Sequence, residues 1–155
     1  MGMRETLAEL QALVTAEPRT GAWVLIDQHR INQFAEATGD HQWIHVDPER
    51  ARKESPYGAT IAHGYLTLSM ISSLTKTTQG EAPPYSGAKL AVNYGLNKVR
   101  FPAPVKVNSR IRATTRFKEV VETGGAIQLV REVTVEVEGQ DKPACVAESL
   151  TRLYF

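Results

Sequence analysis

Several things that the sequence lacks limit the kind of protein it encodes. Cysteine occurs once in 155 residues, at Cys145, so the chain has no internal disulfide and suits a reducing compartment such as the cytoplasm. Neither charge is in excess, because 18 Lys and Arg accompany 17 Asp and Glu. This balance disfavours nucleic acid as a partner. The chain has no run of about 18 apolar residues, and its first residues carry no apolar core of a secretory leader. We therefore expect a cytoplasmic protein with no membrane partner.

The chain has the length of one ordinary domain. A chain of 155 residues can bury a core without disulfides or metals to support it. Internal repeats and low-complexity segments are absent from the sequence. We therefore expect a single domain over residues 1–155.

The first half of the sequence predicts short helices with clear ends. Apolar residues at helical spacing predict a helix over residues 4–16, and a short apolar run predicts a strand over residues 21–27. Asp27 and Gly39 are the residue types that begin and end a helix, and Asp47 followed by proline begins another. Asp40 is therefore expected just beyond a helix end.

The longest helix is predicted over residues 65–78. Leucine, isoleucine and methionine occupy most of its circumference, so it belongs inside the protein, and it contains no Asp or Glu.

The second half predicts strand after strand. Extended segments are expected over residues 90–100, 109–121, 127–137 and 144–154, with Gly124-Gly125 forming a tight turn. Apolar and polar residues alternate in them, except where Val130 and Arg131 break the pattern. The fold class is therefore α+β, with a curved antiparallel sheet wrapped around a long buried central helix.

One region carries residues suited to chemistry. Gly39-Asp40, His45 five residues after the aspartate, and His63-Gly64 at the start of the long helix form a spaced pattern. This pattern resembles the MaoC-like, or hydratase-2, family of the hot-dog fold. The strings at residues 39–47 and 93–101 are more similar still to the branch of nodulation protein N.

The resemblance implies an enzyme. It implies (R)-specific hydration of trans-2-enoyl-CoA thioesters to (R)-3-hydroxyacyl-CoA, with no cofactor beyond the CoA of the substrate and no metal. Asp40 and His45 match the catalytic pair, Gly64 the residue whose N–H holds the thioester oxygen, and Ser72 a serine that orients the acid. The resemblance also implies a homodimer, with sheets paired edge to edge. The better-known branch has Asn-Pro between the aspartate and the histidine, where this chain has Gln42-Trp43.

This chemistry needs these residue types. Adding water to an enoyl thioester requires a base for the water proton and an acid for the α-carbon, and a carboxyl and an imidazole holding one water can serve both. The sequence does not assign the two roles. The side chains of Asn93 and Asn97 are candidates to line the cleft.

Other interpretations of these residues stay open. Asp40 can satisfy a loop, His45 can be structural, Ser72 can bond back to its own helix, and His63 is better explained as a structural neighbour of Gly64. The histidines and aspartates at positions 40, 41, 45, 47 and 63 can bind zinc, although Gly39 and Pro48 break the helix that would carry them. The alternative functions are an acyl-CoA thioesterase of the same fold, a non-catalytic acyl-thioester-binding protein, and a subunit acting on carrier-bound substrates. The missing acid in the long helix disfavours the thioesterase.

Overall fold

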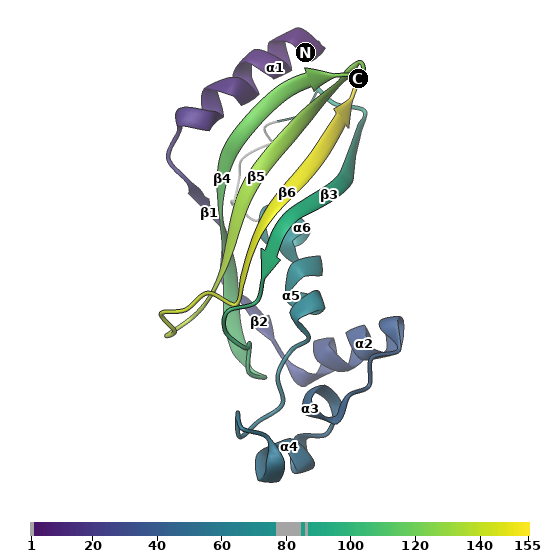
Figure 1. The fold of residues 1–155 in the computed structure, drawn as a ribbon, viewed down its shortest axis with the longest axis vertical. Coiled ribbons are helices and arrows are strands. Elements are labelled where there is room, and N and C mark those ends of the chain that lie inside the picture. The colour runs from purple at the N-terminus through teal and green to yellow at the C-terminus, as the bar shows by residue number, and fades with distance from the viewer. Residues whose placement is uncertain (1, 77–84, 86) are drawn as a thin grey trace.

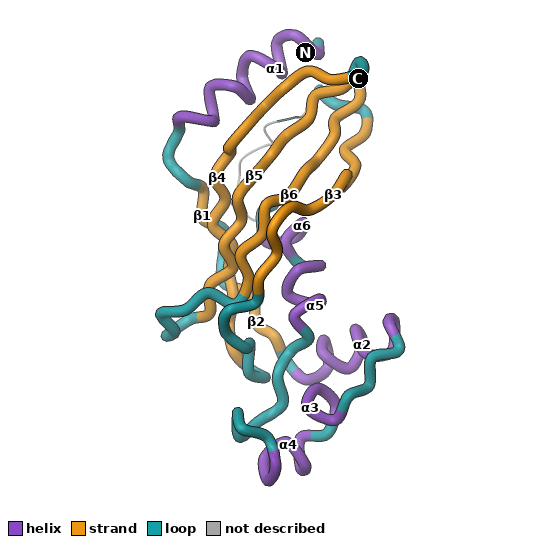
Figure 2. Tube along the Cα trace, viewed as in Figure 1, coloured by secondary structure: helices purple, strands orange, loops and turns teal. Residues whose placement is uncertain are grey.

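A curved six-stranded antiparallel sheet dominates the protein (Figures 1 and 2). The computed structural model describes residues 2–76, 85 and 87–155. Along the sheet the order is β1-β4-β5-β6-β3, and β2 also pairs with β4, so that β3 forms one edge. The strands are β1 (Arg19–Thr20), β2 (Val24–Ile26), β3 (Leu90–Arg100), β4 (Ser109–Thr123), β5 (Ala126–Val137) and β6 (Cys145–Tyr154).

The helices lie at both ends of the sheet and along it. They are α1 (Met3–Ala12), α2 (Gln28–Thr38), α3 (Trp43–Val46), α4 (Pro48–Glu54), α5 (Gly64–Ser69) and α6 (Ile71–Leu74), with a 3₁₀ turn over Leu13–Thr15. Figure 1 shows α2, α3 and α4 together at one end, α1 at the other, and α5 and α6 between them. None of the helices in the described part of the chain is long and apolar enough to cross a membrane.

Local capping sets the helix ends that position the candidate site. The Asp27 carboxylate accepts a hydrogen bond from the Arg30 N–H at 2.9 Å and begins α2. Gly39 ends α2 with φ of 78°, a left-handed conformation that glycine adopts without steric cost. Asp47 caps α4 in the same way as Asp27 caps α2. These predicted ends are confirmed, and they place Asp40 directly after α2.

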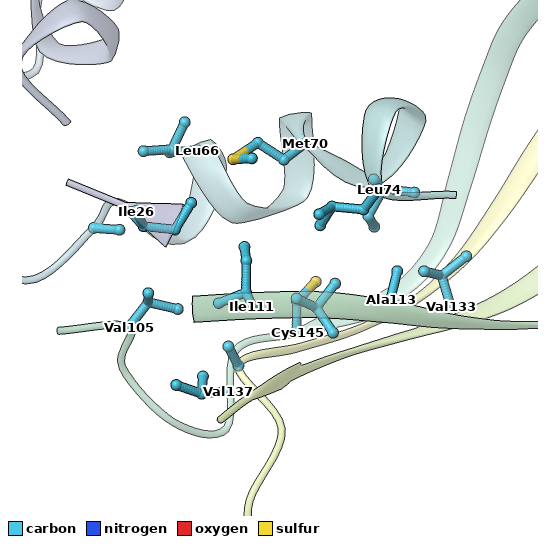
Figure 3. Packing of buried hydrophobic residues seen from close by; sticks show 14 of the residues in the cluster. Ile26, Leu66, Met70, Leu74, Val105, Ile111, Ala113, Val133, Val137 and Cys145 are labelled. Atoms are coloured by element: carbon cyan, nitrogen blue, oxygen red, sulfur yellow. The ribbon is translucent and has the colours of Figure 1, made fainter. Parts of the chain in front are cut away.

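The core lies between the helical segment α5–α6 and the concave face of the sheet. Leu66, Met70 and Leu74 of this segment belong to one buried cluster with residues of the strands, and Leu74 extends toward the strand that carries Ile111 and Ala113 (Figure 3). The strand residues of this cluster include Ile111, Ala113, Val133 and Cys145. A second apolar cluster joins Leu10 of α1 to Phe117, Ile127, Leu129 and Leu153. The predicted α+β arrangement of sheet and helix is therefore confirmed.

Two predicted elements differ from the structure. The strand expected over residues 21–27 is shorter than predicted, because only β2 forms there, and the two-residue strand β1 precedes it at Arg19–Thr20; the two strands pair with different parts of β4. The long helix is two short pieces, α5 and α6, that meet at Met70, and the end expected at residues 77–78 lies outside the described residues. Its surface is also less buried than predicted, because Tyr65 is 69% exposed. The sheet covers one side of this segment and leaves the other side open.

Candidate active site

Asp40 lies in the loop between α2 and α3, with an exposed side chain. Its carboxylate accepts a hydrogen bond from the Gln42 N–H at 3.3 Å, a contact within the same turn. Gly39 reverses the chain at the end of α2. The Asp40 carboxyl, in the loop that follows, is therefore accessible to solvent.

His45 is the buried partner of this carboxyl. It lies in the short helix α3 and is 7% exposed. Its Nδ1 donates to the backbone carbonyl of Ile61 at 2.7 Å, and a carbonyl can only accept. In the neutral ring Nε2 therefore carries a lone pair. Burial lowers the pKa of His45, and this effect outweighs the opposing effect of the Ile61 carbonyl. The ring is accordingly neutral near pH 7, with Nε2 free to accept a proton.

His63 braces both members of this pair. Its Nε2 donates to the backbone carbonyl of Asp40 at 2.9 Å, and its ring stacks on that of His45 with centroids 3.8 Å apart. Phe34 of α2 contacts His63, with the two ring centroids 5.0 Å apart. The Nδ1 of His63 is buried and lacks a hydrogen-bond partner within the described structure. His63 is thus more than the neighbour of Gly64 that the sequence suggests.

The three side chains converge on one small volume. A carboxylate oxygen of Asp40 and one ring nitrogen from each of His45 and His63 all lie within 4.8 Å of one another. The other candidates for zinc are not in this group: His41 bonds Glu36 at 2.8 Å, and Asp47 caps α4. The rings of His45 and His63 are stacked with centroids 3.8 Å apart and an interplanar angle of 24°, so their lone pairs lie in two separate and nearly parallel planes. Tetrahedral coordination requires ligands that aim at a common point, and this geometry fits a zinc ion poorly.

Gly64 is the first residue of α5 and follows His63 directly. At the first helical position its N–H has no acceptor within the helix. A Cβ at this position would lie 2.9 Å from Cδ2 of the Phe101 ring, closer than real Cβ atoms approach. A side chain here would therefore force the Phe101 ring to move, whereas glycine leaves room for both and keeps a backbone donor next to His63.

Ser72 and Asn93 line a pocket of about 310 Å³ between α5–α6 and the strands β3 and β6. The Asn93 amide lies 3.5 Å from the Ser72 hydroxyl. Ser69 and Ser73 bond back to carbonyls of their own helices, whereas Ser72 faces the pocket. The role expected for Ser72 is not supported within one chain, because its described hydrogen bond is to Asn93 and not to Asp40.

Asn97 does not reach this pocket. Its amide donates to the Glu148 carboxylate at 2.9 Å, and Glu148 also accepts from Lys118 at 3.2 Å. Glu148 alternates with the buried residues of β6 and so lies on the outer face of the sheet. The expectation that Asn97 lines the cleft is therefore wrong for this chain, because a shift of register between Asn93 and Gly95 turns the strand.

Several supporting groups had no signal in the sequence. The Ile61 carbonyl accepts a hydrogen bond from the His45 ring, and the Ile61 N–H donates to the Ile44 carbonyl at 3.0 Å. Ile61 therefore makes two hydrogen bonds to residues of α3. The side chain of Gln28 donates to the His45 carbonyl at 2.7 Å. Backbone groups look alike in every sequence, and a glutamine in the first turn of a helix is ordinary. Only the tertiary contacts reveal these roles.

Comparison with known proteins identifies relatives over nearly the whole chain. A family model described as MaoC like domain matches residues 9–144. The 3-hydroxyacyl-thioester dehydratase Z of Mycobacterium tuberculosis is 53% identical over 149 residues, which are 96% of this chain and 95% of that protein. Nodulation protein N of Rhizobium leguminosarum is 41% identical over 151 residues, covering 97% and 92%.

Solved structures share the fold. A monoamine oxidase regulatory protein from Archaeoglobus fulgius superposes with a TM-score of 0.74 at 23% identity, over 88% of each chain. The (R)-hydratase from A. caviae superposes with a TM-score of 0.67 at 19% identity, over 87% of this chain and 92% of the other. The predicted hot-dog fold is thereby confirmed.

Proposed function

The chain belongs to the MaoC-like dehydratase family, a family of hydro-lyases, and we propose that it hydrates trans-2-enoyl-CoA thioesters to (R)-3-hydroxyacyl-CoA, or catalyses the reverse dehydration. The observation that carries this proposal is the convergence of Asp40 with a neutral, oriented His45. The relative from M. tuberculosis is named for its action on 3-hydroxyacyl thioesters, and the pocket beside α5–α6 has partly apolar walls suited to an acyl chain.

The spacing of the two groups suits one shared water. Two atoms that each hydrogen-bond the same tetrahedral oxygen at about 2.8 Å lie roughly 4.6 Å apart. The Asp40 oxygen and the His45 nitrogen lie within 4.8 Å of each other, which is compatible with such a bridge. In this mechanism the water is held between the Asp40 carboxyl and Nε2 of His45.

The proton transfers follow from the tautomer of His45. The Nδ1–H of His45 donates to the Ile61 carbonyl, so the lone pair of Nε2 faces the water. Nε2 accepts a proton from the water as the water oxygen adds to C3 of the substrate. A proton is returned to C2 on the same face from the Asp40 and His45 pair. The reverse sequence removes water from a 3-hydroxyacyl thioester.

The thioester oxygen needs a hydrogen-bond donor as negative charge develops on it. We assign this role to the Gly64 N–H, which has no acceptor within α5 and stands at the positive end of the helix. The absence of a side chain lets the thioester approach the backbone closely. An unreactive acyl thioester bound in a crystal should place its carbonyl oxygen at this N–H.

The edge strand β3 supports a homodimer. Every residue of β3 except Val99 is exposed, and the exposed residues include the large apolar side chains Leu90, Val92, Tyr94 and Leu96. An open apolar edge is a template for pairing with another strand. We propose that two copies pair through β3, which would also cover the outward side of α5 that Tyr65 leaves exposed.

A direct assay tests the proposed reaction. Enoyl-CoAs of graded chain length would be followed by the loss of absorbance of the conjugated double bond, with chiral analysis of the product and a parallel assay for free thiol. We expect (R)-3-hydroxyacyl-CoA and no thiol release. Parallel assays with carrier-bound substrates would identify the natural thioester.

Matched variants then test the two side chains. Asp40→Asn and His45→Gln should each lower kcat by about 10²–10⁴-fold, the usual contribution of a general acid or base. Asp141→Asn and His29→Gln change exposed residues of the same types and should leave kcat unchanged. Near-normal turnover by Asp40→Asn would reject the mechanism, and thiol release by the unmodified protein would favour a thioesterase.

A further inference from the structure

A polar gap interrupts the concave face of the sheet. Arg131 points inward from β5 between the buried residues Leu129 and Val133, and it is only 8% exposed. It lies between the two apolar clusters, one around α5–α6 and one around α1. An arginine is almost never buried in a core without a charged partner. The groups around Arg131 therefore indicate what kind of partner this site accepts.

The partners of this guanidinium among the described residues are neutral hydroxyl groups. It donates to the Thr151 hydroxyl at 3.2 Å and contacts the Tyr85 hydroxyl. Its Nε is buried with no acceptor within the described structure, and so is the hydroxyl of Ser149 on the paired strand. No carboxylate among the described residues forms an ion pair with Arg131. Burial lowers the pKa of Arg131, and the Tyr85 hydroxyl opposes this effect.

The guanidinium borders open space. Arg131 lines both the pocket of about 310 Å³ and an adjoining one of about 150 Å³, and the two pockets share Ser72 and Asn93. Lys76 adds a second cation to the smaller pocket. The described residues that line the two pockets include no Asp or Glu. Apolar walls of the larger pocket come from Leu68, Ile71, Leu96 and Leu150.

This combination of walls and charge selects a type of ligand. The apolar walls suit methylene groups, and a desolvated guanidinium with free donors suits a carboxylate, which it can bind through two parallel hydrogen bonds. A buried cation without a counter-ion is unfavourable, so a ligand that supplies the anion gains the interaction in a site where water competes poorly.

The pocket also lies at a useful distance from the proposed reaction centre. Ser72 follows Gly64 by eight residues, which corresponds to about 12 Å of helical rise. A ligand whose thioester oxygen is held at the start of α5 and which runs along the α5–α6 segment therefore needs a medium-length chain to reach Arg131.

We propose that the pocket beside Arg131 binds a carboxylate at the far end of the acyl chain, so that the protein prefers ω-carboxyacyl thioesters to methyl-ended ones of the same length. This rests on the proposed function, because the ligand is the acyl thioester of that reaction. Arg131 is then a specificity-determining residue. It would act away from the bonds that are made and broken.

Binding of unreactive ligands tests this without turnover. Calorimetry would compare the CoA thioester of octanedioic acid with octanoyl-CoA. The unmodified protein should bind the carboxylate-ended ligand about 30-fold more tightly or better, the range measured for buried charge pairs. Arg131→Met should remove this preference and leave octanoyl-CoA binding within about threefold. Arg116→Met, an exposed arginine on the neighbouring strand β4, is the matched control and should change neither affinity.

The outcomes separate the two proposals. Equal binding of both ligands by the unmodified protein, or a preference that survives Arg131→Met, overturns the role of Arg131. Thermal unfolding would check that Arg131→Met folds; if it does not, Arg131→Gln replaces it and the preference of the unmodified protein decides. A preference for the carboxylate with no hydration of any enoyl-CoA supports this pocket and overturns the proposed reaction. Hydration of enoyl-CoA without a preference for the carboxylate-ended ligand supports the proposed reaction and overturns the role of Arg131.

Discussion

Replacing His63 by leucine would remove a side chain that touches both proposed catalytic residues without reacting itself. The leucine keeps the site apolar and filled. It deletes the hydrogen bond from Nε2 to the Asp40 carbonyl, 2.9 Å long, and the ring stacked 3.8 Å from that of His45. His63→Gln is the conservative partner, because its amide can donate in the place of Nε2.

The size of the effect follows from these contacts. A neutral hydrogen bond contributes about 0.5–1.5 kcal/mol, and an aromatic pair about 0.5–1.5 kcal/mol beyond its buried area. Asp40 is exposed, and its carbonyl can bond water once His63 is lost. We therefore place the loss of ordering at about 1–2 kcal/mol, or roughly five- to thirtyfold in kcat/KM, since about 1.4 kcal/mol is tenfold.

The pH profile separates this role from a merely structural one. A charge on His63 contributes to lowering the pKa of His45, after the larger effect of burial. Both His63→Leu and His63→Gln should therefore raise the pKa of His45, and the acid limb of kcat/KM should move to higher pH. His63→Gln should recover most of the rate at its own pH optimum.

Hydration of crotonyl-CoA measured across pH would show both effects, with thermal unfolding as a check on the fold. Normal kcat/KM in His63→Leu together with an unmoved acid limb would refute the reasoning.

Three further predictions address His45, Gly64 and the sheet edge. Because the pKa of His45 is lowered from its ordinary value of 6.5, the acid limb of kcat/KM should have its midpoint below pH 6.5. As pH falls, the unfolded chain takes up this proton before the folded protein does, so the stability that His45 contributes is present above pH 6.5 and is lost as pH falls through the folded pKa. An acid limb above pH 6.5 contradicts this. Gly64→Ala should lower kcat because its Cβ would collide with Phe101, 2.9 Å away, and Phe101→Leu in the same chain should partly restore it; unchanged kcat in the single variant would show that the contact yields freely. Val92→Lys on the exposed edge of β3 should convert a dimer to a monomer in light scattering, whereas a monomeric unmodified protein would rule out this pairing.

Much of the fold was predictable because it depends on local rules. Asp27 and Gly39 set the ends of α2 through contacts within a few residues, and Asp47 does so for α4. The alternation of β4 and β5 places the same residues inside that the sequence pattern indicates. The long helix was only partly predicted, because its open side is set by how far the sheet curves around it.

The candidate site was predictable in its members and not in its arrangement. The spacing of Asp40 and His45 indicated a pair, and the structure brings the two side chains together. The same pattern gave no sign that Asn97 turns to Glu148 on the outer face, because an irregular register in β3 determines this.

The sequence by itself determined where helices begin and end, which strand faces are apolar, and which residues have the chemistry for a hydro-lyase, because capping, periodicity and side-chain type act over a few residues. Only the tertiary structure decided that His45 donates Nδ1–H to Ile61, that His63 stacks on it, and that Arg131 faces a pocket whose described lining residues include no Asp or Glu. These properties depend on groups 16 or more residues apart, brought together by the packing of helices on the sheet.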